Sequence, residues 1–410
     1  MTTDEILFGF GLTVALAVGS QLLAGRLRIP ALIVLLPTGF VAGALTSDID
    51  PHRLLGAAFE PLVSLSVALI LYEAGFGLDL RKLKGDTRRI VARLIVVGVP
   101  LTMAAAALLA AVLLDLSTGA AVMLGAILVV SGPTVVSPLL GFVRPAERVQ
   151  RILLWEGSLI DPIGGILGAV VFSGVVQKTR TGSGVHALQF GLSIGAGLAG
   201  GVIGTGLLWL LMRRLRFGDV LANTGQLAIV VVVAAACDIA RDDAGLLAAI
   251  IMGLAVANLK GFDLPADRPV SETLVQLIIG VLFISISATI TPSSLADVAL
   301  PALGLITALV LLVRPLLAYL STFGTGLTTG ERCFIGWMDP RGIVAAATAS
   351  TFSVELAAQG IGGASKILPV TFLVIVATVT LYGLTATPVA RRLHVVRAAD
   401  QSDQPPGPGP

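Results

Sequence analysis

The stretch RVQRILLWEGSLIDPIGGILGAV, residues 148–170, decides how the rest of the chain is interpreted. It is long and apolar enough to cross a bilayer, and it carries two carboxylates, Glu156 and Asp161, near its middle. A charged side chain at bilayer depth costs about 2.5–3.5 kcal/mol on insertion scales. Anchoring in a membrane does not require that cost, so the stretch predicts an ion or proton site.

The spacing of the two carboxylates predicts separate roles for them. Five residues of α-helix turn through about 500°, so the side chains of Glu156 and Asp161 point roughly 140° apart. Pro162, directly after Asp161, lacks a backbone N–H and loosens the preceding turn. The small residues that leave room for another helix to approach are Gly157, Gly164, Gly165 and Gly168.

The composition is typical of a helical membrane protein. Of 410 residues, 55% are hydrophobic and 13% are charged, and the mean hydropathy is +0.95, whereas soluble domains carry about 25% charged residues. The 47 glycines suit close helix packing in lipid. We therefore expect an all-α polytopic membrane protein surrounded by lipid, with no cofactor and no nucleic-acid partner.

Hydropathy predicts about thirteen transmembrane helices. The candidate spans lie near residues 5–24, 30–46, 58–78, 90–114, 117–140, 148–176, 187–212, 219–240, 244–259, 271–290, 296–321, 330–354 and 367–389. With the N-terminus outside, most of the 27 basic residues fall in inside loops, as the positive-inside rule requires. We expect a transmembrane domain over residues 1–396 of the inner (plasma) membrane, with the C-terminus in the cytoplasm. The Pro-rich tail, 397–410, is expected to be disordered.

Proline interrupts two of these spans. Span 5 contains Gly132-Pro133, and span 12 contains Pro340. Irregular backbone at membrane depth is tolerated where it lines a site. The broken spans are seven apart, and an odd offset reverses direction across the membrane, so spans 1–6 and 8–13 are expected to form two inverted six-helix repeats. Such paired interruptions indicate the binding site of a transporter.

Asp161 is the expected carrier of the transported ion. A carboxylate binds a monovalent cation or a proton but not both together, and this competition alone produces exchange. Hard cations prefer oxygen ligands, so hydroxyl groups and the carbonyls freed by the breaks are expected to complete the site. The candidate hydroxyls are Ser131, Thr134 and Ser158, and helix packing is the alternative role for each of them.

Other charged residues are expected to support the site. Glu156 is expected to form a structural ion pair with Arg341, because a lone buried charge is costly; a second carrier is the alternative. Glu73 is expected to line a cytoplasmic funnel unless it is exposed at the interface. Asp339 is expected to tune the site or to cap a half-helix, and Arg314 to reach the inner interface as a structural residue.

Four motifs, in this order and spacing, resemble a known family. They are LYEAGFGLDLRKLK (71–84), SGPTVVSPLL (131–140), EGSLIDP (156–162) and DPRGIVAAA (339–347). They are similar to the sodium/proton antiporters of the cation/proton antiporter superfamily, most closely the electroneutral NhaP-like bacterial branch, over nearly the whole chain. The resemblance implies a homodimer and an elevator-like core that moves against a dimerisation domain. It also implies that Asp161 matches the ion-binding aspartate, Glu156 the preceding glutamate and Arg341 the arginine that stabilises it.

The sequence departs from that branch at two positions. Ile160-Asp161 stands where Asn-Asp is usual, and Ser131-Gly132-Pro133 stands where Thr-Asp-Pro is usual. The site has therefore lost one side-chain amide and one carboxylate. A single carrier carboxylate predicts one cation per proton, unless Asp339 also titrates.

We therefore expect a secondary active antiporter of protons and a monovalent cation, with Na⁺ favoured over K⁺ or Li⁺. A cation channel and a non-transporting ion or pH sensor are the alternatives within this fold. An intramembrane aspartyl protease requires two catalytic aspartates in facing spans. GFGLD (75–79) is only superficially similar to the Gly-rich loop of such enzymes, and Asp79 falls at the inner interface.

Overall fold

Helices make up nearly all of the regular structure in the computed structural model of the chain. The structure describes residues 2–27, 29–76, 78, 81, 83–177, 184–214, 219–241, 244–259, 262 and 269–396. Over these ranges the only strand-type pairing is an isolated bridge between Pro145 and Val396. The all-α fold class is therefore confirmed, whereas Asp79 and the predicted disordered tail lie outside the described residues.

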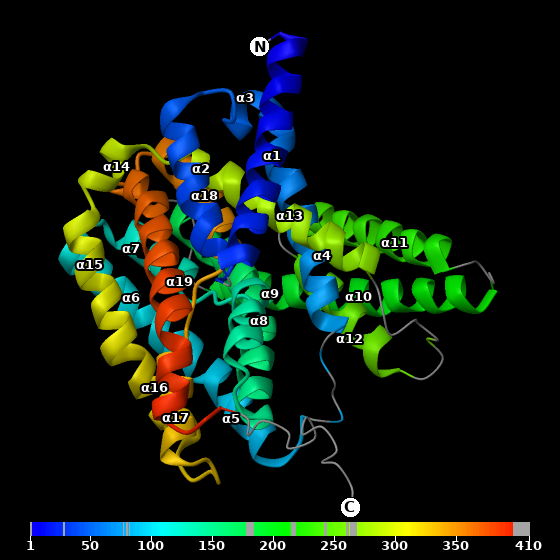
Figure 1. The fold of residues 1–410 in the computed structure, drawn as a ribbon, viewed down its shortest axis with the longest axis vertical. Coiled ribbons are helices and arrows are strands. Elements are labelled where there is room, and N and C mark those ends of the chain that lie inside the picture. Colours follow the sequence, from blue (N-terminus) through cyan, green and yellow to red (C-terminus); the bar gives the residue numbers. More distant parts are fainter. Residues whose placement is uncertain are drawn as a thin grey trace, which may run out of the picture.

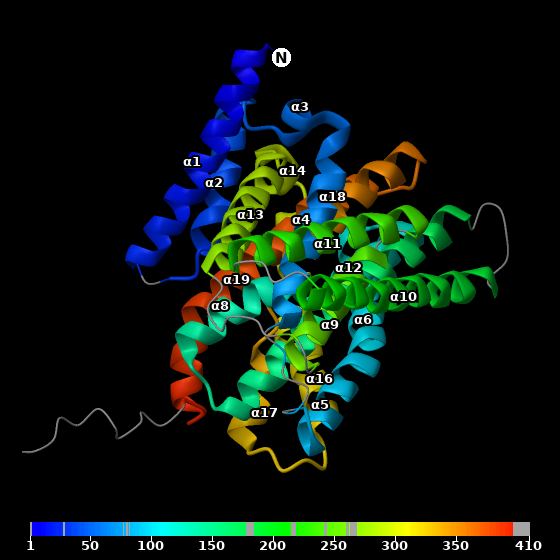
Figure 2. The same cartoon turned by 90° about the vertical axis from the view of Figure 1, so that its right-hand side faces the viewer.

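Two helical bundles share the described chain, each built from two separate stretches of sequence (Figure 1). The first bundle comprises α1 (Thr3–Leu27), α2 (Leu32–Leu45), α3 (Pro51–Leu55), η1 (Gly56–Ala58), α4 (Phe59–Phe76), α10 (Gly184–Arg214), α11 (Asp219–Ala240), α12 (Ala244–Asn258) and α13 (Pro269–Ala288). Within it, α12 packs against α4, α10 and α11, while α13 packs against α1 and α2. Figure 2 shows α10 and α11 side by side, projecting from one flank.

The second bundle contains the stretch around Asp161. It comprises α5 (Gly85–Val96), α6 (Gly98–Leu114), α7 (Thr118–Ile127), α8 (Pro133–Val143), α9 (Glu147–Gln177), α14 (Pro292–Ala296), α15 (Ala299–Ala308), the π-turn η3 (Leu309–Val313), α16 (Arg314–Thr322), α17 (Thr329–Trp337), α18 (Ile343–Ala358), η4 (Ala364–Lys366) and α19 (Ile367–Arg392). A capping box between Thr328 and Glu331 begins α17, because it satisfies two backbone donors that the first turn leaves free.

The predicted spans each have a counterpart in the described chain. Eight of its helices have the length and composition to cross a membrane, and the five shorter apolar helices are 32–45, 118–127, 244–258, 273–288 and 344–358. The predicted span 148–176 corresponds to α9, which continues unbroken through Pro162. Both predicted breaks are confirmed: α7 ends at Ile127 and α8 begins at Pro133, and α17 ends at Trp337 and α18 begins at Ile343.

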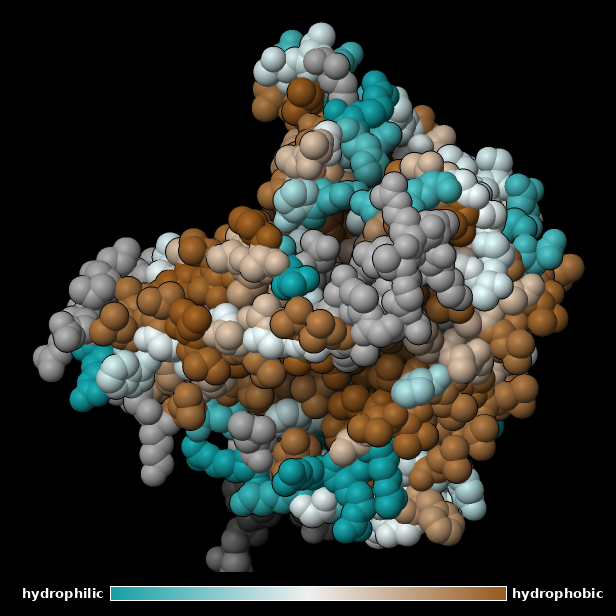
Figure 3. Space-filling view, turned by 180° about the vertical axis from the view of Figure 1, so that it is seen from behind, coloured by the Kyte–Doolittle hydropathy of each residue, from teal (hydrophilic) through white to brown (hydrophobic). Residues whose placement is uncertain are grey.

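The outer surface matches a bilayer. Apolar residues cover the middle of the face seen in Figure 3, and hydrophilic residues gather at its two ends. Large apolar side chains on the outside include Leu22 at 70% exposure, Leu108 at 67% and Leu300 at 80%. Exposed apolar surface on this scale is stable only in contact with lipid or with another protein.

Polar contacts tie together the ends of three elements at the α5 end of the second bundle. The Arg148 guanidinium donates to Asp86 at 3.2 Å and to the Gly326 carbonyl at 3.0 Å. The Gly326 N–H donates to the same carboxylate at 3.1 Å. These bonds join the starts of α5 and α9 to the α16–α17 loop, so the second bundle is closed at this end.

Apolar contacts line part of the seam between the bundles. Phe40 of α2 contacts Phe372 of α19 with ring centroids 5.9 Å apart. Gly383 of α19 lies directly against the Ile33 side chain of α2. Contacts of this kind have no preferred direction.

Candidate functional site

The first helix break lies along the face of α9 that carries Asp161. A Cβ atom at Gly157 would approach the backbone of Gly132 and Pro133 at 3.6 Å, and one at Gly164 would overlap Val130. Asp161 stands between these two glycines, so the irregular segment passes directly beside its carboxylate. The glycine spacing on α9 therefore lets the break come within contact distance of the carboxylate.

Asp161 is fully buried and has no hydrogen-bond partner among the described residues. Its exposed fraction is 0%, and both carboxylate oxygens lack a partner in the part of the chain that the structure describes. An ionised carboxylate without partners is very unfavourable in a buried position. A proton or a cation on the carboxylate would remove this cost.

The start of α8 lies beside the Asp161 carboxylate. Gly132 is the N-cap residue and Pro133 occupies the first turn. The N-terminus of a helix carries a partial positive charge, so it favours the negative charge of the carboxylate. This partial charge is smaller than a full unit, so it does not neutralise an ionised carboxylate completely.

The second break contacts the first through Arg341. Its guanidinium donates to the Val129 carbonyl at 3.0 Å and to Asp339 at 2.7 Å. Val129 follows the end of α7, where carbonyl groups carry a partial negative charge. The two breaks therefore meet with complementary charges: Arg341 faces the C-terminal end of α7, and Asp161 faces the N-terminal end of α8.

Glu156 forms an ion pair with Arg314, so the predicted pairing with Arg341 is wrong. The two guanidinium nitrogens of Arg314 donate to the Glu156 carboxylate at 2.5 and 2.9 Å, and its Nε donates to the Ile335 carbonyl at 3.1 Å. Arg341 lies on the extended backbone of the break with Asp339 two residues before it. Alternate residues of extended backbone project to the same side, so Arg341 pairs with Asp339.

The prediction that Arg314 reaches the inner interface is also wrong. Its exposed fraction is 3%. The π-turn Leu309–Val313 directly precedes it, and Pro315 follows it at the start of α16. A π-turn changes the direction in which the next residues project, and here it turns Arg314 into the protein. The Arg-Pro pair within a long apolar run was the signal in the sequence for this irregular, inward-facing turn.

The charges around Asp161 balance except for Asp161 itself. Glu156 and Asp339 supply two negative charges, and Arg314 and Arg341 supply two positive ones. Asp339 joins the pairs, because its carboxylate lies 2.7 Å from Arg341 and 3.9 Å from Arg314. An ionised Asp161 therefore adds one uncompensated negative charge to this cluster. One proton or one monovalent cation neutralises it.

The hydroxyls predicted as ligands are only partly described. Ser158 is 1% exposed and Ser131 is 4% exposed. Ser158 precedes Asp161 by three residues on α9, which places the two on neighbouring positions of one helix face. Thr134 lies in the first turn of α8, but its side chain is outside what the structure describes. Their roles as ligands remain predictions.

Glu73 and Asp161 lie on different bundles. Glu73 is half-buried near the end of α4 and belongs to the first bundle. The sequence predicted that it lines a cytoplasmic funnel, and this also remains a prediction. The ion-paired residues Glu156, Arg314, Asp339 and Arg341 all belong to the second bundle.

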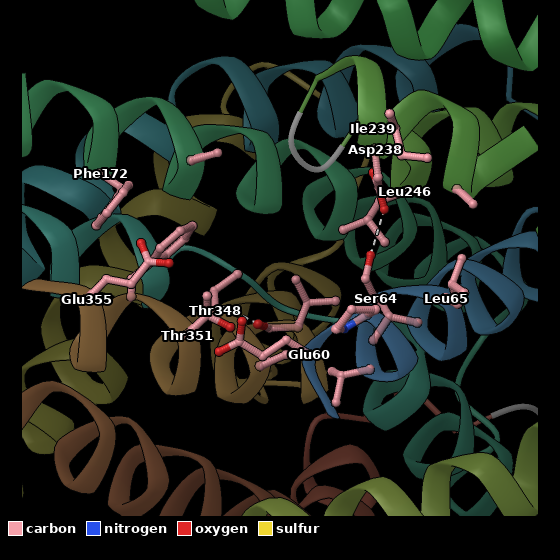
Figure 4. A pocket seen from close by; sticks show the side chains of 18 residues that line it. Glu60, Ser64, Leu65, Phe172, Asp238, Ile239, Leu246, Thr348, Thr351 and Glu355 are labelled. Carbon is pink, nitrogen blue, oxygen red and sulfur yellow. Dashed lines mark hydrogen bonds between the residues drawn. The ribbon is translucent and has the colours of Figure 1, made fainter. Parts of the chain in front are cut away.

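A cavity of about 580 Å³ opens on the seam between the bundles. The first bundle contributes Glu60, Ser64 and Asp238, and the second contributes Phe172 and Glu355. Figure 4 shows Phe172 and Glu355 at one end, Asp238 at the other and Glu60 between them. The Ser64 hydroxyl donates to Asp238 at 2.7 Å. Carboxylates on both walls favour cations over anions in this cavity.

Helices α9 and α18 form part of the cavity wall. Ala169 on α9 and Val344 on α18 line it. Ala169 follows Asp161 by eight residues, which corresponds to about 12 Å of helix. Val344 is in the first turn of α18, directly after the second break. The rings of Phe172 and Phe352 stack with centroids 4.9 Å apart, and both line the cavity.

Comparisons with known proteins agree with this architecture. The family model described as "Sodium/hydrogen exchanger, transmembrane" matches residues 12–392. The chain is similar to the K(+)/H(+) antiporter NhaP2 of Shewanella sp. (strain MR-4), with 28% identity over 407 residues, covering 96% of this chain and 68% of the relative. It is also similar to the Na(+)/H(+) antiporter 1 of Methanocaldococcus jannaschii, with 25% identity over 371 residues, covering 86% of this chain and 85% of the relative.

One solved structure reproduces the fold. It is the sodium proton antiporter MjNhaP1 from Methanocaldococcus jannaschii, with a TM-score of 0.81 and 22% sequence identity. The match covers 95% of this chain and 99% of the other. At this identity the likeness concerns the arrangement of the helices.

Proposed function

Because the chain belongs to the sodium/hydrogen exchanger family, we propose that it exchanges protons for a monovalent cation across a membrane, with Asp161 binding each in turn. Membership assigns it to the NhaP-like branch of the monovalent cation/proton antiporter superfamily. It is a multi-pass membrane transporter and not an enzyme. The identity of the cation, the stoichiometry and the motion are parts of the proposal.

The state of Asp161 is the observation that carries the proposal. It is the one carboxylate of the described cluster whose two oxygens have no partner. Protonation neutralises it, and so does a bound cation, but each excludes the other. Competition for one carboxylate is sufficient to couple the transport of the proton to that of the cation.

Na⁺ and K⁺ are both candidates for the cation. The relatives' names include K(+)/H(+) and Na(+)/H(+) antiporters, and the sequence-based prediction favours Na⁺. Oxygen ligands from Ser131, Ser158 and the break carbonyls suit either ion. The proposed cation-binding set therefore comprises Asp161, Ser131, Thr134 and Ser158.

Electroneutral exchange follows from the charge balance. If the four paired charges keep their states, the cluster is neutral with either one cation or one proton on Asp161. Moving a neutral unit through the membrane field requires no electrical work. A transport current in a voltage-clamped membrane would contradict this stoichiometry and would point to Asp339 as a second titrating group.

Alternating access is proposed to occur by motion of the second bundle against the first. The site and both breaks belong to the second bundle, so it can carry the ion as a rigid unit, as in an elevator. The apolar contacts at the seam favour sliding. The cavity lined by Glu60 and Glu355 is the proposed access route to Asp161 from one side of the membrane.

We propose the orientation from the distribution of basic residues, and the assembly from the exposed apolar surface. The basic loops fall on one side, which the positive-inside rule assigns to the cytoplasm, and this sets the N-terminus outside the inner membrane. The exposed apolar side chains of the first bundle are consistent with a homodimer whose fixed part is that bundle. The inverted repeat remains a proposal based on the matching positions of the two breaks.

Inside-out vesicles from an antiporter-deficient strain, with a pH-sensitive dye, test the proposal. Na⁺, K⁺ and Li⁺ are added in turn to vesicles that contain the native protein or Asp161→Asn. We expect the native protein alone to collapse the proton gradient. If no cation does so at any pH, the protein is a sensor rather than an exchanger. Cation flux without proton counterflow indicates a channel.

A further inference from the structure

The position of Gly132 beside Asp161 leads to an inference about ion selectivity, which rests on the proposed function. The sequence shows only that glycine replaces the aspartate usual in this branch. The structure adds the reason why this position matters. A Cβ atom at residue 132 would lie 2.9 Å from Asp161 Oδ2 and 3.1 Å from Oδ1. Carbon–oxygen contacts of this length are repulsive, so a side chain here and the present position of the carboxylate exclude each other.

The backbone at Gly132 does not explain the glycine. Its φ of −104° and ψ of 151° are extended values, which any residue adopts at little cost. Other residues are also accepted at the N-cap of a helix. The missing side chain therefore matters for the space it leaves, and the Asp161 carboxylate occupies that space.

We propose that Gly132 sets the size of the cation site by letting the Asp161 carboxylate lie back against the start of α8, and that the site formed in this way admits K⁺ as well as Na⁺. K⁺ is the larger ion and needs a wider arrangement of oxygens. Selectivity between these ions depends on the size of the site and on the number and field strength of its oxygens. With no side chain at residue 132, the Asp161 carboxylate lies directly against the start of α8, and this position leaves the site wider on the opposite side of the carboxylate.

A methyl group in this position is the direct test. In Gly132→Ala, the Cβ atom pushes the carboxylate away from α8 and narrows the site from that side. One methylene in a binding pocket changes discrimination by about 10-fold or more. We expect the apparent affinity for K⁺ to fall by about 10-fold relative to that for Li⁺, with Na⁺ between them.

Gly141→Ala is the matched control. Gly141 lies in the same helix, and a Cβ atom there would have no atom within 4 Å. Each variant adds one methyl group, Gly132→Ala at the N-cap of α8 and Gly141→Ala within the helix. Only Gly132→Ala touches the carboxylate, so only it should change the ratio of the K⁺ and Na⁺ affinities.

The measurement uses the purified full chain in liposomes, with a pH gradient and increasing concentrations of Li⁺, Na⁺ or K⁺. Cation-dependent thermal stability is recorded in parallel, because a bound ion stabilises the folded state. Gly132→Ser is made alongside, so that poor folding of one variant does not end the test. Its Cβ atom occupies the same position.

Four outcomes decide the inference. A K⁺-selective loss in Gly132→Ala, absent in Gly141→Ala, supports it. Equal losses for all three cations, or none, overturn it. A native protein that exchanges Na⁺ but excludes K⁺ also overturns it, without any variant. If the native protein exchanges no cation, the proposed antiport itself fails, which is distinct from failure of the role of Gly132.

Discussion

Glu156 and Asp161 lie on the same helix five residues apart, yet their surroundings are opposite. The Glu156 carboxylate accepts two hydrogen bonds from Arg314. The Asp161 carboxylate accepts none from any described residue. Both are buried, with exposed fractions of 2% and 0%. Burial alone therefore does not distinguish a structural carboxylate from one that exchanges ligands. The presence or absence of a paired arginine side chain distinguishes them.

The difference follows from which element each carboxylate faces. Glu156 faces α16, where the π-turn projects an arginine that cannot release its charge. Asp161 faces the N-terminus of α8, which supplies only part of a charge. Glu156 therefore has a full counter-charge within hydrogen-bond distance. Asp161 has no such partner among the described residues, which suits the exchange of a proton for a cation that we propose for it.

The largest effect is expected from removing the exchangeable charge. Asp161→Asn keeps the size of the side chain and removes the group for which the ions compete, so exchange should fall to the background of vesicles without the protein. Unfolding midpoints should not decrease, because no partner is left unpaired. Residual exchange above background would assign the carrier to Asp339 or Glu156 and would remove the contrast between the two carboxylates.

Removing the fixed pair should affect stability rather than ion selection. Glu156→Gln leaves the Arg314 guanidinium buried without its counter-charge, which typically costs about 3–5 kcal/mol. Thermal or denaturant unfolding in detergent measures this loss. The double variant Glu156→Gln with Arg314→Gln removes both charges and should recover much of it. If the double variant is no more stable than the single one, the pair is not the main source of the cost.

Cation binding should stabilise the native protein in a pH-dependent way. A ligand that binds only the folded state adds about 2.7 kcal/mol at 100 times its Kd. Lowering the pH should reduce this gain, because protons compete for Asp161, and raising the cation concentration should restore it. Unfolding measured across pH and cation concentration checks this. In Asp161→Asn the gain should be absent at every pH, whereas a persistent gain would mean a second cation site.

Ser158→Ala should give the smallest change. Loss of one hydroxyl ligand is expected to weaken cation affinity by about 2- to 10-fold, equivalent to one ordinary hydrogen bond. The concentration of cation that half-collapses the proton gradient reports it. Unchanged affinity would assign Ser158 to helix packing and would leave the cation shell to Ser131, Thr134 and the break carbonyls.

The helices were predictable because their signals are local. The length of an apolar run reports a span directly, and Pro133 and Pro340 mark breaks within their own segments. Asp161 was identifiable for the same reason, as a charge inside an apolar run. These inferences require no knowledge of which helices pack together.

The pairing of charges was not predictable to the same degree. Glu156 and Arg314 are separated by 158 residues, and their meeting depends on the rotation of α16 about its axis. The π-turn at Leu309–Val313 changes that rotation, and hydropathy does not register it. The closeness of Gly132 to Asp161 was not predictable either. The sequence shows that a carboxylate is missing at residue 132, but not that the Asp161 carboxylate lies against this position.

The contacts between the breaks also bear on how the protein is assembled during synthesis. Arg341 reaches a carbonyl 212 residues earlier in the chain, and at 5–20 residues per second that interval is roughly 10–40 s. The span with Glu156 and Asp161 therefore enters the membrane well before either arginine exists. Until Arg314 is synthesised, the Glu156 carboxylate lacks the cationic partner that it has in the finished protein. The N-terminal half therefore spends this interval in the membrane without the contacts that the C-terminal half later provides. The length of that interval is set by the rate of translation.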